Sequence, residues 1–583
     1  DAAFHLHVSG AGALRDDQRL LAAKVDLACA RRARRAGSER SAYEHASRGC
    51  GLLGDVGWST AYELTLELHT EAACAAFAVG AAEDFGRLAR RVKERARSFI
   101  DELPMQEVVV VALTGSGDVR GAFDLVCEGA RRLGLSLPSE PGADDVAAAA
   151  WRIDLALAKM TPEWLAKAER VDDPPAVALL RLLGLGNAAA YTARPHLLRM
   201  LVALELDLSA RHGFSDVTAL ALAYLAALDC ASPETVRRGI GIRARALAAA
   251  QRVQDGAILA RTLDIVHGMT SAWTGPLRGA VAPLLDNARL GLEHGAFDYA
   301  GYSALKSCFF ALLSGMPLDE VAGRLDAWRQ TLGEVGQRLA HAYLSRDRQV
   351  VELLRRRAER ATEVTGEFSD EASCWRDYDE QDDHYGALYL AVGKLLLAAV
   401  FVDPVAATEA SIRLARHAKG GYGLPHLVFG RFYAAVCAWD AAHAGLMNRA
   451  DALGRIDETL AEVAGCAEFV PLTFAHKLTL LRGLSADLRG ATAEALEALD
   501  RAVEGARSSA YLHEAGLAAE RASRICARIG RSDQAEVFRA RADEAWTGWG
   551  ASAAIRRRAV AAAPTPREAE ALASTTDEPH AIE

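Results

Sequence analysis

The sequence is poor in aromatic residues, in long apolar runs and in closely spaced cysteines. Aromatic residues make up 7% of its 583 positions, and its ten cysteines stand singly, with no CxxC pair. This spacing argues against a structural zinc site and against the disulfide framework of a small secreted protein. A reducing, cytoplasmic environment therefore fits the sequence best, and we expect no metal site.

The most apolar stretch is shorter than a membrane span. It runs from Ala387 to Val402 and is interrupted by Gly393 and Lys394, whereas a spanning helix needs roughly 20 apolar residues. The net charge of −10 argues against a continuous basic surface for nucleic acid or anionic lipid. We expect neither a membrane nor a nucleic acid as a partner.

Alanine and leucine dominate the sequence instead, and both favour helix. The segments Gly275 to Gly295 and Met316 to Gly336 share a Pro-Leu start, an apolar stripe with helical spacing and a terminal glycine, and they begin 41 residues apart. Residues 256–275 and 297–315 predict the second helix of each unit. Weaker echoes pair Gly80 with Gly117 and Gly490 with Gly530.

A repeat of roughly 34–45 residues built from two helices is typical of tetratricopeptide-type (TPR) arrays, in which neighbouring hairpins bury each other's apolar stripes. The sequence therefore predicts an all-α fold, a superhelical array of antiparallel helical hairpins (a TPR-like α-solenoid). We expect repeats over 1–366 and 385–560, an acidic inter-repeat loop or hinge over 367–384, and a disordered linker over 561–583. Because the chain begins with Asp1, we also expect a segment of a longer polypeptide.

Two motifs imitate nucleotide-binding sites. An apparent strand from Val108 to Leu113 meets Gly115, Gly117 and Gly121, but the spacing is GxGxxxG rather than the GxGxxG of a dinucleotide-binding turn. The triplet Asp84-Phe85-Gly86 occurs in protein kinases, but the other kinase motifs are missing upstream. The internal repeat favours helices at both places.

Two groups of residues raise the question of a metal. The acidic residues Asp377, Asp379, Asp382 and Asp383 precede His384. An EF-hand loop starting at Asp377 would need Gly at 382 and Glu at 388, where the chain has Asp and Leu. A solvated acidic loop is the favoured interpretation, and cation binding stays open. His5 and His7 have no third ligand nearby in the sequence and are interpreted as incidental.

The usual phosphate-loop, nucleophile-elbow and zinc-protease motifs are absent. We therefore expect a non-enzymatic segment without catalytic residues and without a cofactor of its own. Trp273, Tyr299 and Tyr302 lie near the predicted repeat turns and are candidates for a groove that binds a ligand or a partner on the inner surface of the array. The alternative is that they pack between helices.

Several stretches resemble the central helical-repeat region of very large bacterial signalling proteins. They are Leu20 to Ala73, Gly121 to Pro138, Trp273 to Val321 and Phe474 to Ala551. In that family a serine/threonine kinase-like domain and a STAND-type ATPase module precede the repeats, and a GAF domain and often a histidine kinase follow them. The resemblance implies that ATP and magnesium belong to the parent polypeptide and not to this segment.

The same resemblance implies a sensor or scaffold arm for protein interaction in signal transduction, which binds a protein partner or neighbouring domains of its own chain. Two other classes stay open. One is a non-catalytic binding protein of another kind, which is either a receptor arm that binds a small-molecule inducer or a free-standing TPR-like adaptor. The other is an enzyme with an unrecognised site near residues 377–384, in which replacing the acids with Asn would abolish an activity.

Overall fold

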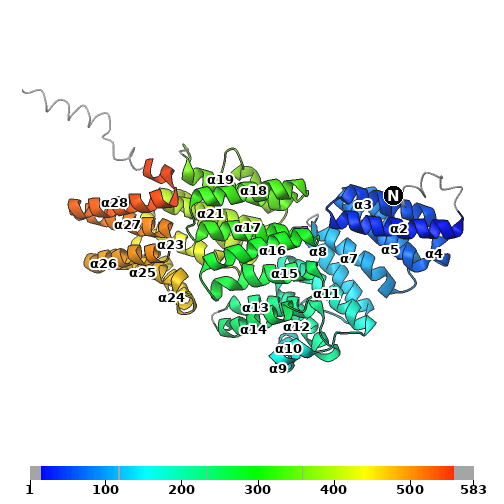
Figure 1. Cartoon of the computed structure of the whole chain (residues 1–583). Helices are drawn as coiled ribbons and strands as arrows, with labels where there is room; N and C mark the ends of the chain where they lie inside the picture. Colours follow the sequence, from blue (N-terminus) through cyan, green and yellow to red (C-terminus); the bar gives the residue numbers. More distant parts are fainter. Residues whose placement is uncertain (1–14, 116–117, 233, 357–358, 557–583) are drawn as a thin grey trace, which may run out of the picture. The chain divides into compact units, whose positions relative to one another are not determined.

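The computed structural model describes residues 15–556 except 116–117, 233 and 357–358, and the regular elements of this part are helices (Figure 1). The β-type backbone pairing in this part of the chain is one isolated bridge, between Arg170 and Phe214. The predicted all-α fold is confirmed. His5, His7, Gly117 and the tail 561–583 lie outside the described residues.

The chain divides into two compact units, each described by itself. Unit 1 comprises Asp1–Thr270 with Pro283–Ser303, and unit 2 comprises Ser271–Ala282 with Ala304–Glu583. This division does not coincide with the 367–384 boundary expected from the sequence. Two helices cross it, α16 (Val281–Glu293) and α17 (Phe297–Leu313).

The remaining helices belong to one unit or the other. Unit 1 contains α2 (Asp16–Arg35), α3 (Glu39–Leu53), α4 (Gly57–Thr60), α5 (Tyr62–Ala78), α6 (Ala82–Arg95), α7 (Phe99–Gly115), α8 (Val119–Arg132), α9 (Ala143–Lys159), α10 (Pro162–Lys167), α11 (Pro174–Ala193), α12 (Pro195–His212), α13 (Asp216–Cys230), α14 (Val236–Ala250) and α15 (Gly256–Ile265). Unit 2 contains α18 (Leu318–Glu334), α19 (Arg338–Arg355), α20 (Glu371–Glu380), α21 (His384–Phe401), α22 (Pro404–Arg416), α23 (His426–His443), α24 (Arg449–Phe469), α25 (Pro471–Leu488), α26 (Thr492–Ser508), α27 (Leu512–Arg528) and α28 (Ser532–Trp549).

Within each unit the helices pack mainly against their neighbours in sequence, as in the pairs α13 with α14, α25 with α26, and α27 with α28. Two kinds of helix occur. Inner helices such as α13 and α21 are buried on nearly all sides. Outer helices bury one stripe, which in α26 consists of Ala495, Ala498, Leu499, Ala502, Val503 and Ala506. This is the hairpin array that the repeat predicts.

The prolines and glycines of the repeated segments lie at the starts and ends of helices. Gly295 and Gly336 end their helices with φ of 74° and 73°, a left-handed conformation in which glycine is unstrained. Gly490 and Gly530 do the same. Pro317 stands at the N-cap of α18, and Pro276 precedes a 3₁₀ turn over Leu277–Ala280 that leads into α16.

The predicted helix over 256–275 is interrupted. Its regular α-helical part, α15, ends at Ile265, and a π-helical turn (Val266–Thr270) and a 3₁₀ turn (Ser271–Trp273) follow. The apparent strand at 108–113 lies inside α7, and the kinase-like triplet begins within the first turn of α6. The helical interpretation of both motifs is therefore confirmed.

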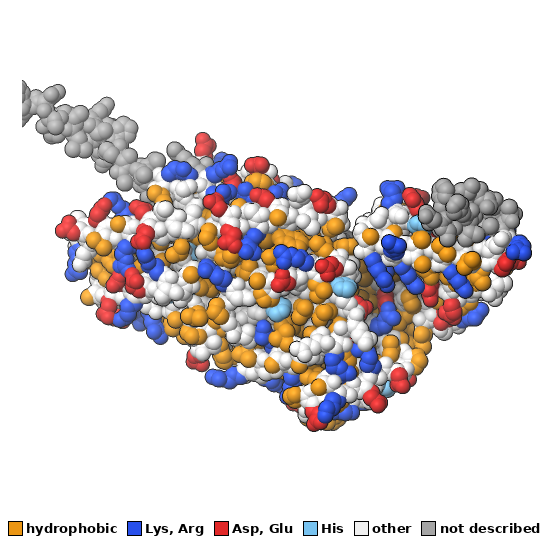
Figure 2. Space-filling view, in the orientation of Figure 1, with side chains coloured by type: hydrophobic (Ala, Val, Ile, Leu, Met, Phe, Trp, Pro, Cys, Tyr) orange, Lys and Arg blue, Asp and Glu red, His pale blue; other side chains and the backbone are white. Residues whose placement is uncertain are grey.

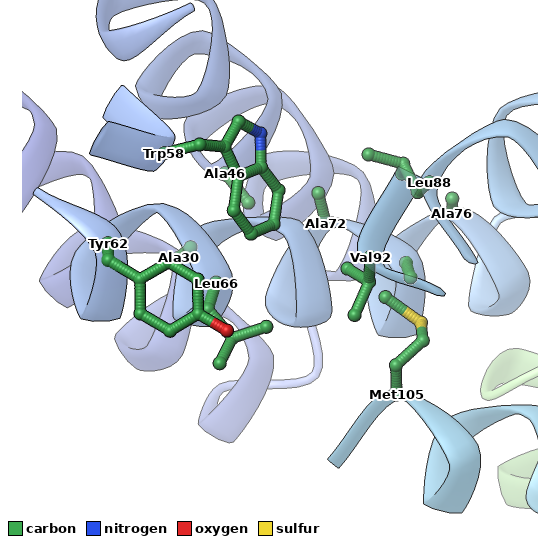
Figure 3. Close-up of a cluster of buried hydrophobic side chains, with 11 residues drawn as sticks. Ala30, Ala46, Trp58, Tyr62, Leu66, Ala72, Ala76, Leu88, Val92 and Met105 are labelled. Carbon is green, nitrogen blue, oxygen red and sulfur yellow. The ribbon is translucent and has the colours of Figure 1, made fainter. Parts of the chain in front are cut away.

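The first hairpins of unit 1 show how small residues and a few large ones form a core (Figure 3). Alanines at 30, 46, 72 and 76 let the helices approach closely. Trp58 packs edge-on against Tyr62 with ring centroids 5.9 Å apart. Leu88, Val92 and Met105 close the same cluster from α6 and α7. Alanine-rich contacts of this kind explain how the chain forms a core with few aromatic residues.

Helix α21 is long and apolar enough to cross a membrane by length and composition, with a mean hydropathy of 1.5. Its position in unit 2 is that of a core helix, because 89% of it is buried inside the protein. Lys394, near its middle, is 4% exposed and pairs with Glu371 of α20. The helix is thus accounted for by packing within the unit.

Candidate functional site

Trp273, one of the three aromatic candidates, is a buried residue of unit 2. It lies in the 3₁₀ turn before α16, is 8% exposed and stacks on Phe474 of α25 with centroids 6.4 Å apart. Its indole N–H donates to the carbonyl oxygen of Gly423 at 3.4 Å. These contacts are typical of a residue that packs between helices.

Tyr299 and Tyr302 lie on the part of α17 that belongs to unit 1. Tyr299 is 6% exposed, and its hydroxyl lies 3.4 Å from that of Tyr224. Burial raises the pKa of Tyr299 to about 12. Tyr302 packs edge-on against Tyr299 at 5.9 Å and is partly exposed. The three aromatic candidates therefore belong to two separate units, and a groove lined by them stays a prediction.

A buried polar network lies on the same face of α17 as Tyr299. The Ser303 hydroxyl donates to Asp264 at 2.7 Å and accepts from the Asn287 amide at 2.9 Å. That amide also donates to the carbonyl oxygen of Ala260 at 2.9 Å. The network ties α15, α16 and α17 together at positions where the apolar stripe is interrupted.

The acidic stretch 367–384 is largely a helix and not the loop expected from the sequence. Helix α20 places Glu371, Trp375 and Tyr378 on one buried face. The Glu371 carboxylate accepts from the backbone N–H of Val364 at 2.7 Å and from the Trp375 indole at 3.2 Å, and it pairs with Lys394. Because the charged Glu371 lies on the buried face, the sequence of α20 does not show the continuous apolar stripe of an amphipathic helix.

Three of the other acids of this stretch contact protein groups, whereas the Asp377 side chain is 57% exposed. Asp379 pairs with Arg413 at 2.8 Å, and Asp383 caps α21 by accepting from the Gly386 N–H at 2.8 Å. Asp382 contacts His384 at 2.8 Å. Among the described residues, no group of three or more His, Cys, Asp or Glu side chains could hold a metal ion.

His384 and His417 face one another with their Nδ1 atoms 2.9 Å apart. One ring must donate and the other accept, so the contact requires at least one neutral imidazole. Burial lowers the pKa of both, and that of His417 to about 4, with the neighbouring His384 as the next cause. The pair links the start of α21 to the end of α22.

Unit 2 also encloses a charged cluster that the sequence analysis missed. Lys477 of α25 and Glu514 of α27 are both 0% exposed, and the ammonium lies 2.8 Å from the carboxylate. The ammonium also donates to the carbonyl oxygen of Thr473 at 2.9 Å. The rings of Tyr511 and Phe429 cover it, with centroids 4.1 and 4.6 Å away, at distances where cation–π attraction is favourable.

Two histidines and a tyrosine also surround the Glu514 carboxylate. His476 approaches the Glu514 Oε2 atom at 2.6 Å through its Nε2 atom, which must therefore carry the hydrogen. The Tyr433 hydroxyl lies 3.3 Å from the other carboxylate oxygen and 3.1 Å from Nε2 of His513. The Nδ1 atoms of both imidazoles have no hydrogen-bond partner.

The protonation pattern of the cluster follows from this geometry. Burial alone would raise the pKa of Glu514, but the Lys477 ammonium and the hydrogen bonds from His476 and His513 hold it well below its usual value. Burial, reinforced by Lys477, lowers the pKa of His476 to about 4. The cluster is an ion pair with two neutral imidazoles, and it joins α23, α25 and α27.

Similar buried charges occur elsewhere in unit 2. The Arg521 guanidinium of α27 pairs with Asp440 of α23 at 2.5 Å and donates to the carbonyl oxygen of Ala399 in α21 at 2.7 Å. Arg346 pairs with Asp347 at 2.8 Å. The sequence signal for these groups is weak, because charged residues occupy positions that the repeat otherwise fills with apolar ones.

Two hollows of the described surface are small or shallow. A depression of about 390 Å³, wide open to solvent, lies over Gly80 to Asp84 at the start of α6. A crevice lined by α22 and α23 has about 10 Å³, the space of about one water molecule. On the face shown in Figure 2, side chains of both charges are intermixed.

No family model matches the sequence, and no curated protein matches it. The similar solved structures include one described as a "circular tandem repeat protein with novel repeat topology and enhanced subunit contact surfaces". The two chains are 12% identical, and the match covers 94% of this chain and 98% of that one with a TM-score of 0.15. A TM-score this low supports no argument about function or assembly.

Proposed function

We propose that this chain is a non-catalytic interaction and sensor arm of a multidomain bacterial signalling kinase that carries an ATPase module. The observation behind the proposal is the paired-helix array of each unit, in which inner helices form the core and outer helices present one face to solvent. Arrays of this kind bind partners through extended surfaces. The signalling context rests on the resemblance of the stretches Leu20 to Ala73, Gly121 to Pro138, Trp273 to Val321 and Phe474 to Ala551.

The proposed mechanism is a change in contact between the arm and its neighbouring domains. A partner that binds the array would favour one arrangement of the parent protein over another, and thereby release or restrain the ATPase module. Such coupling requires a difference in binding free energy between the two arrangements. The arm itself supplies binding surface and no chemistry, and it works in the cytoplasm.

The first test is the extent of the native polypeptide, obtained by sequencing its transcript outward from Asp1 and Glu583. A phosphate-loop ATPase upstream and a GAF or kinase domain downstream are the expected result. If both ends of the open reading frame lie near these residues, the signalling arm is excluded and a free-standing adaptor or receptor takes its place.

The second test measures binding directly. The purified chain is titrated by calorimetry into the separately expressed ATPase module, and its own ATP hydrolysis is followed in parallel. We expect heat of binding to the module and no turnover by the chain alone. Sustained turnover by a clean preparation would overturn the non-catalytic assignment, and stabilisation in a small-molecule thermal-shift screen would favour the receptor alternative.

A further inference from the structure

Helix α9 of unit 1 is apolar on two opposite faces. One face is buried against α12 and consists of Ala149, Ile153 and Ala156. The opposite face, consisting of Ala147, Trp151, Leu155 and Ala158, is exposed. An outer helix normally turns polar residues to solvent, and α26 does so. The second apolar face of α9 is therefore unusual within this array.

The exposure of this face is large. Trp151 is 66% exposed and Leu155 is 53% exposed. Tryptophan is among the residues that most often carry the binding free energy of a protein interface. The spacing of Ala147, Trp151, Leu155 and Ala158 follows one helix face over three turns. The face has the composition and the periodicity of a helix-packing surface.

The face is complementary to itself. Trp151 is the middle residue of the 17-residue helix, so an antiparallel copy related by a two-fold axis at Trp151 would place Ala147 opposite Leu155 of the second copy. Leu155 then meets the small side chain of Ala147, and the two Trp151 rings meet each other at the axis, where aromatic pairs favour offset or edge-on packing. A two-fold axis makes every such contact occur twice.

The charges along the face are complementary in the same arrangement. Asp144 lies exposed in the first turn of α9 and Lys159 lies exposed at its last residue. Antiparallel packing brings each carboxylate close to the ammonium of the other copy. Lys159 also donates to the carbonyl oxygen of Ala210 at 2.5 Å, which holds it at the end of the helix. The other charge on this side, Asp154, pairs with Arg238 of α14 at 3.4 Å.

We propose that two copies of this protein associate through α9, packed antiparallel about a two-fold axis at Trp151. Dimerisation goes beyond the proposed signalling function and does not depend on it. Helices of this length are about 25 Å long, so the helix pair alone buries less than the roughly 1,600 Å² of a standard interface. The dimer is accordingly weak, with a dissociation constant on the order of 10–100 µM.

Sedimentation equilibrium of the full 583-residue chain between about 1 and 200 µM tests the proposal. The expected result is a concentration-dependent shift from the 62.3 kDa monomer to twice that mass. Trp151→Glu should weaken the association about tenfold or more. The matched control is Val405→Glu, because Val405 of α22 is equally apolar and 67% exposed, and its replacement should leave the association unchanged.

A charge exchange tests the antiparallel register. Asp144→Lys and Lys159→Glu should each weaken the dimer several-fold at low salt, and the double variant should recover most of the loss, because the exchanged charges again face each other. Circular dichroism melts of each variant confirm that α9 remains folded. A monomer at every concentration overturns the proposal, as does an association that Trp151→Glu leaves unchanged. A double variant no stronger than the single ones overturns the antiparallel register.

Discussion

At the level of single residues, the buried ammonium of Lys477 most needs neighbours that compensate its charge. A fully buried ammonium is tolerated because Glu514, a backbone carbonyl and two aromatic rings surround it. Replacing a whole buried ion pair with apolar groups is often nearly neutral, whereas removing one partner leaves an uncompensated charge and costs about 3–5 kcal/mol. The two situations are separable by mutation.

We predict that Lys477→Met lowers the free energy of unfolding of unit 2 by about 3–5 kcal/mol, since it leaves the Glu514 carboxylate buried without its counter-ion. The double variant Lys477→Met, Glu514→Gln should be less destabilised than the sum of the two single variants. Urea unfolding followed by circular dichroism measures each value. The control is Arg501→Met, which removes an exposed pair with Glu497 and should cost less than about 0.5 kcal/mol. Additive losses at 477 and 514 would show that the two residues are not coupled.

At the level of the element, the cap at the start of α21 shows how one polar residue fixes a helix. Asp383 accepts hydrogen bonds from the Gly386 N–H and from the Tyr343 hydroxyl, at 2.8 and 2.5 Å. It therefore fixes the start of α21, the apolar inner helix of unit 2, to α19. The acidic stretch is thus important for helix initiation, independently of any bound cation.

We predict that Asp383→Ala lowers the free energy of unfolding by about 2 kcal/mol, because a side-chain cap and one further hydrogen bond are lost. Asp383→Asn should retain most of the capping, because Asn caps helices about as well as Asp. Asp377→Ala serves as the matched control, since its carboxylate is 57% exposed. Thermal melts compare the three variants, and equal losses for Asp383→Ala and Asp377→Ala would contradict the capping role.

Elements were predictable from the sequence where a local signal exists. The apolar stripe and the terminal glycine located α16 and α18, because both signals lie within one helix and its turn. Helix α20 was missed because Glu371 occupies its buried face, and the compensating Lys394 lies 23 residues away. The Lys477 cluster was missed for the same reason, since its members come from α23, α25 and α27 and no single segment shows the match.

At the scale of the whole molecule, the chain is two units with different internal chemistry. Each unit has its own core, so the chain is expected to unfold in more than one transition. Unit 2 buries more ionisable groups. Histidines with a lowered pKa number six in unit 2 and two in unit 1 among the described residues: His341, His384, His417, His426, His476 and His513, against His69 and His267.

The sign of the resulting pH dependence is fixed by linkage. A histidine whose pKa is lower in the folded state binds fewer protons there than in the unfolded state, so stability falls as the pH decreases below the unfolded value. For His476 the pKa changes from 6.5 to about 4, which corresponds to roughly 3 kcal/mol lost by pH 4. Its contribution is fully present above pH 6.5 and disappears between pH 6.5 and 4.

We therefore predict that acid opens unit 2 before unit 1. Hydrogen–deuterium exchange with mass spectrometry at pH 7, 5.5 and 4.5, corrected for intrinsic exchange rates, should show peptides of α23, α25 and α27 losing protection first. His476→Gln keeps an N–H donor for Glu514 but cannot titrate, so it should flatten the pH dependence of these peptides relative to the wild type. Earlier loss of protection in α12 and α13 of unit 1 would contradict the prediction.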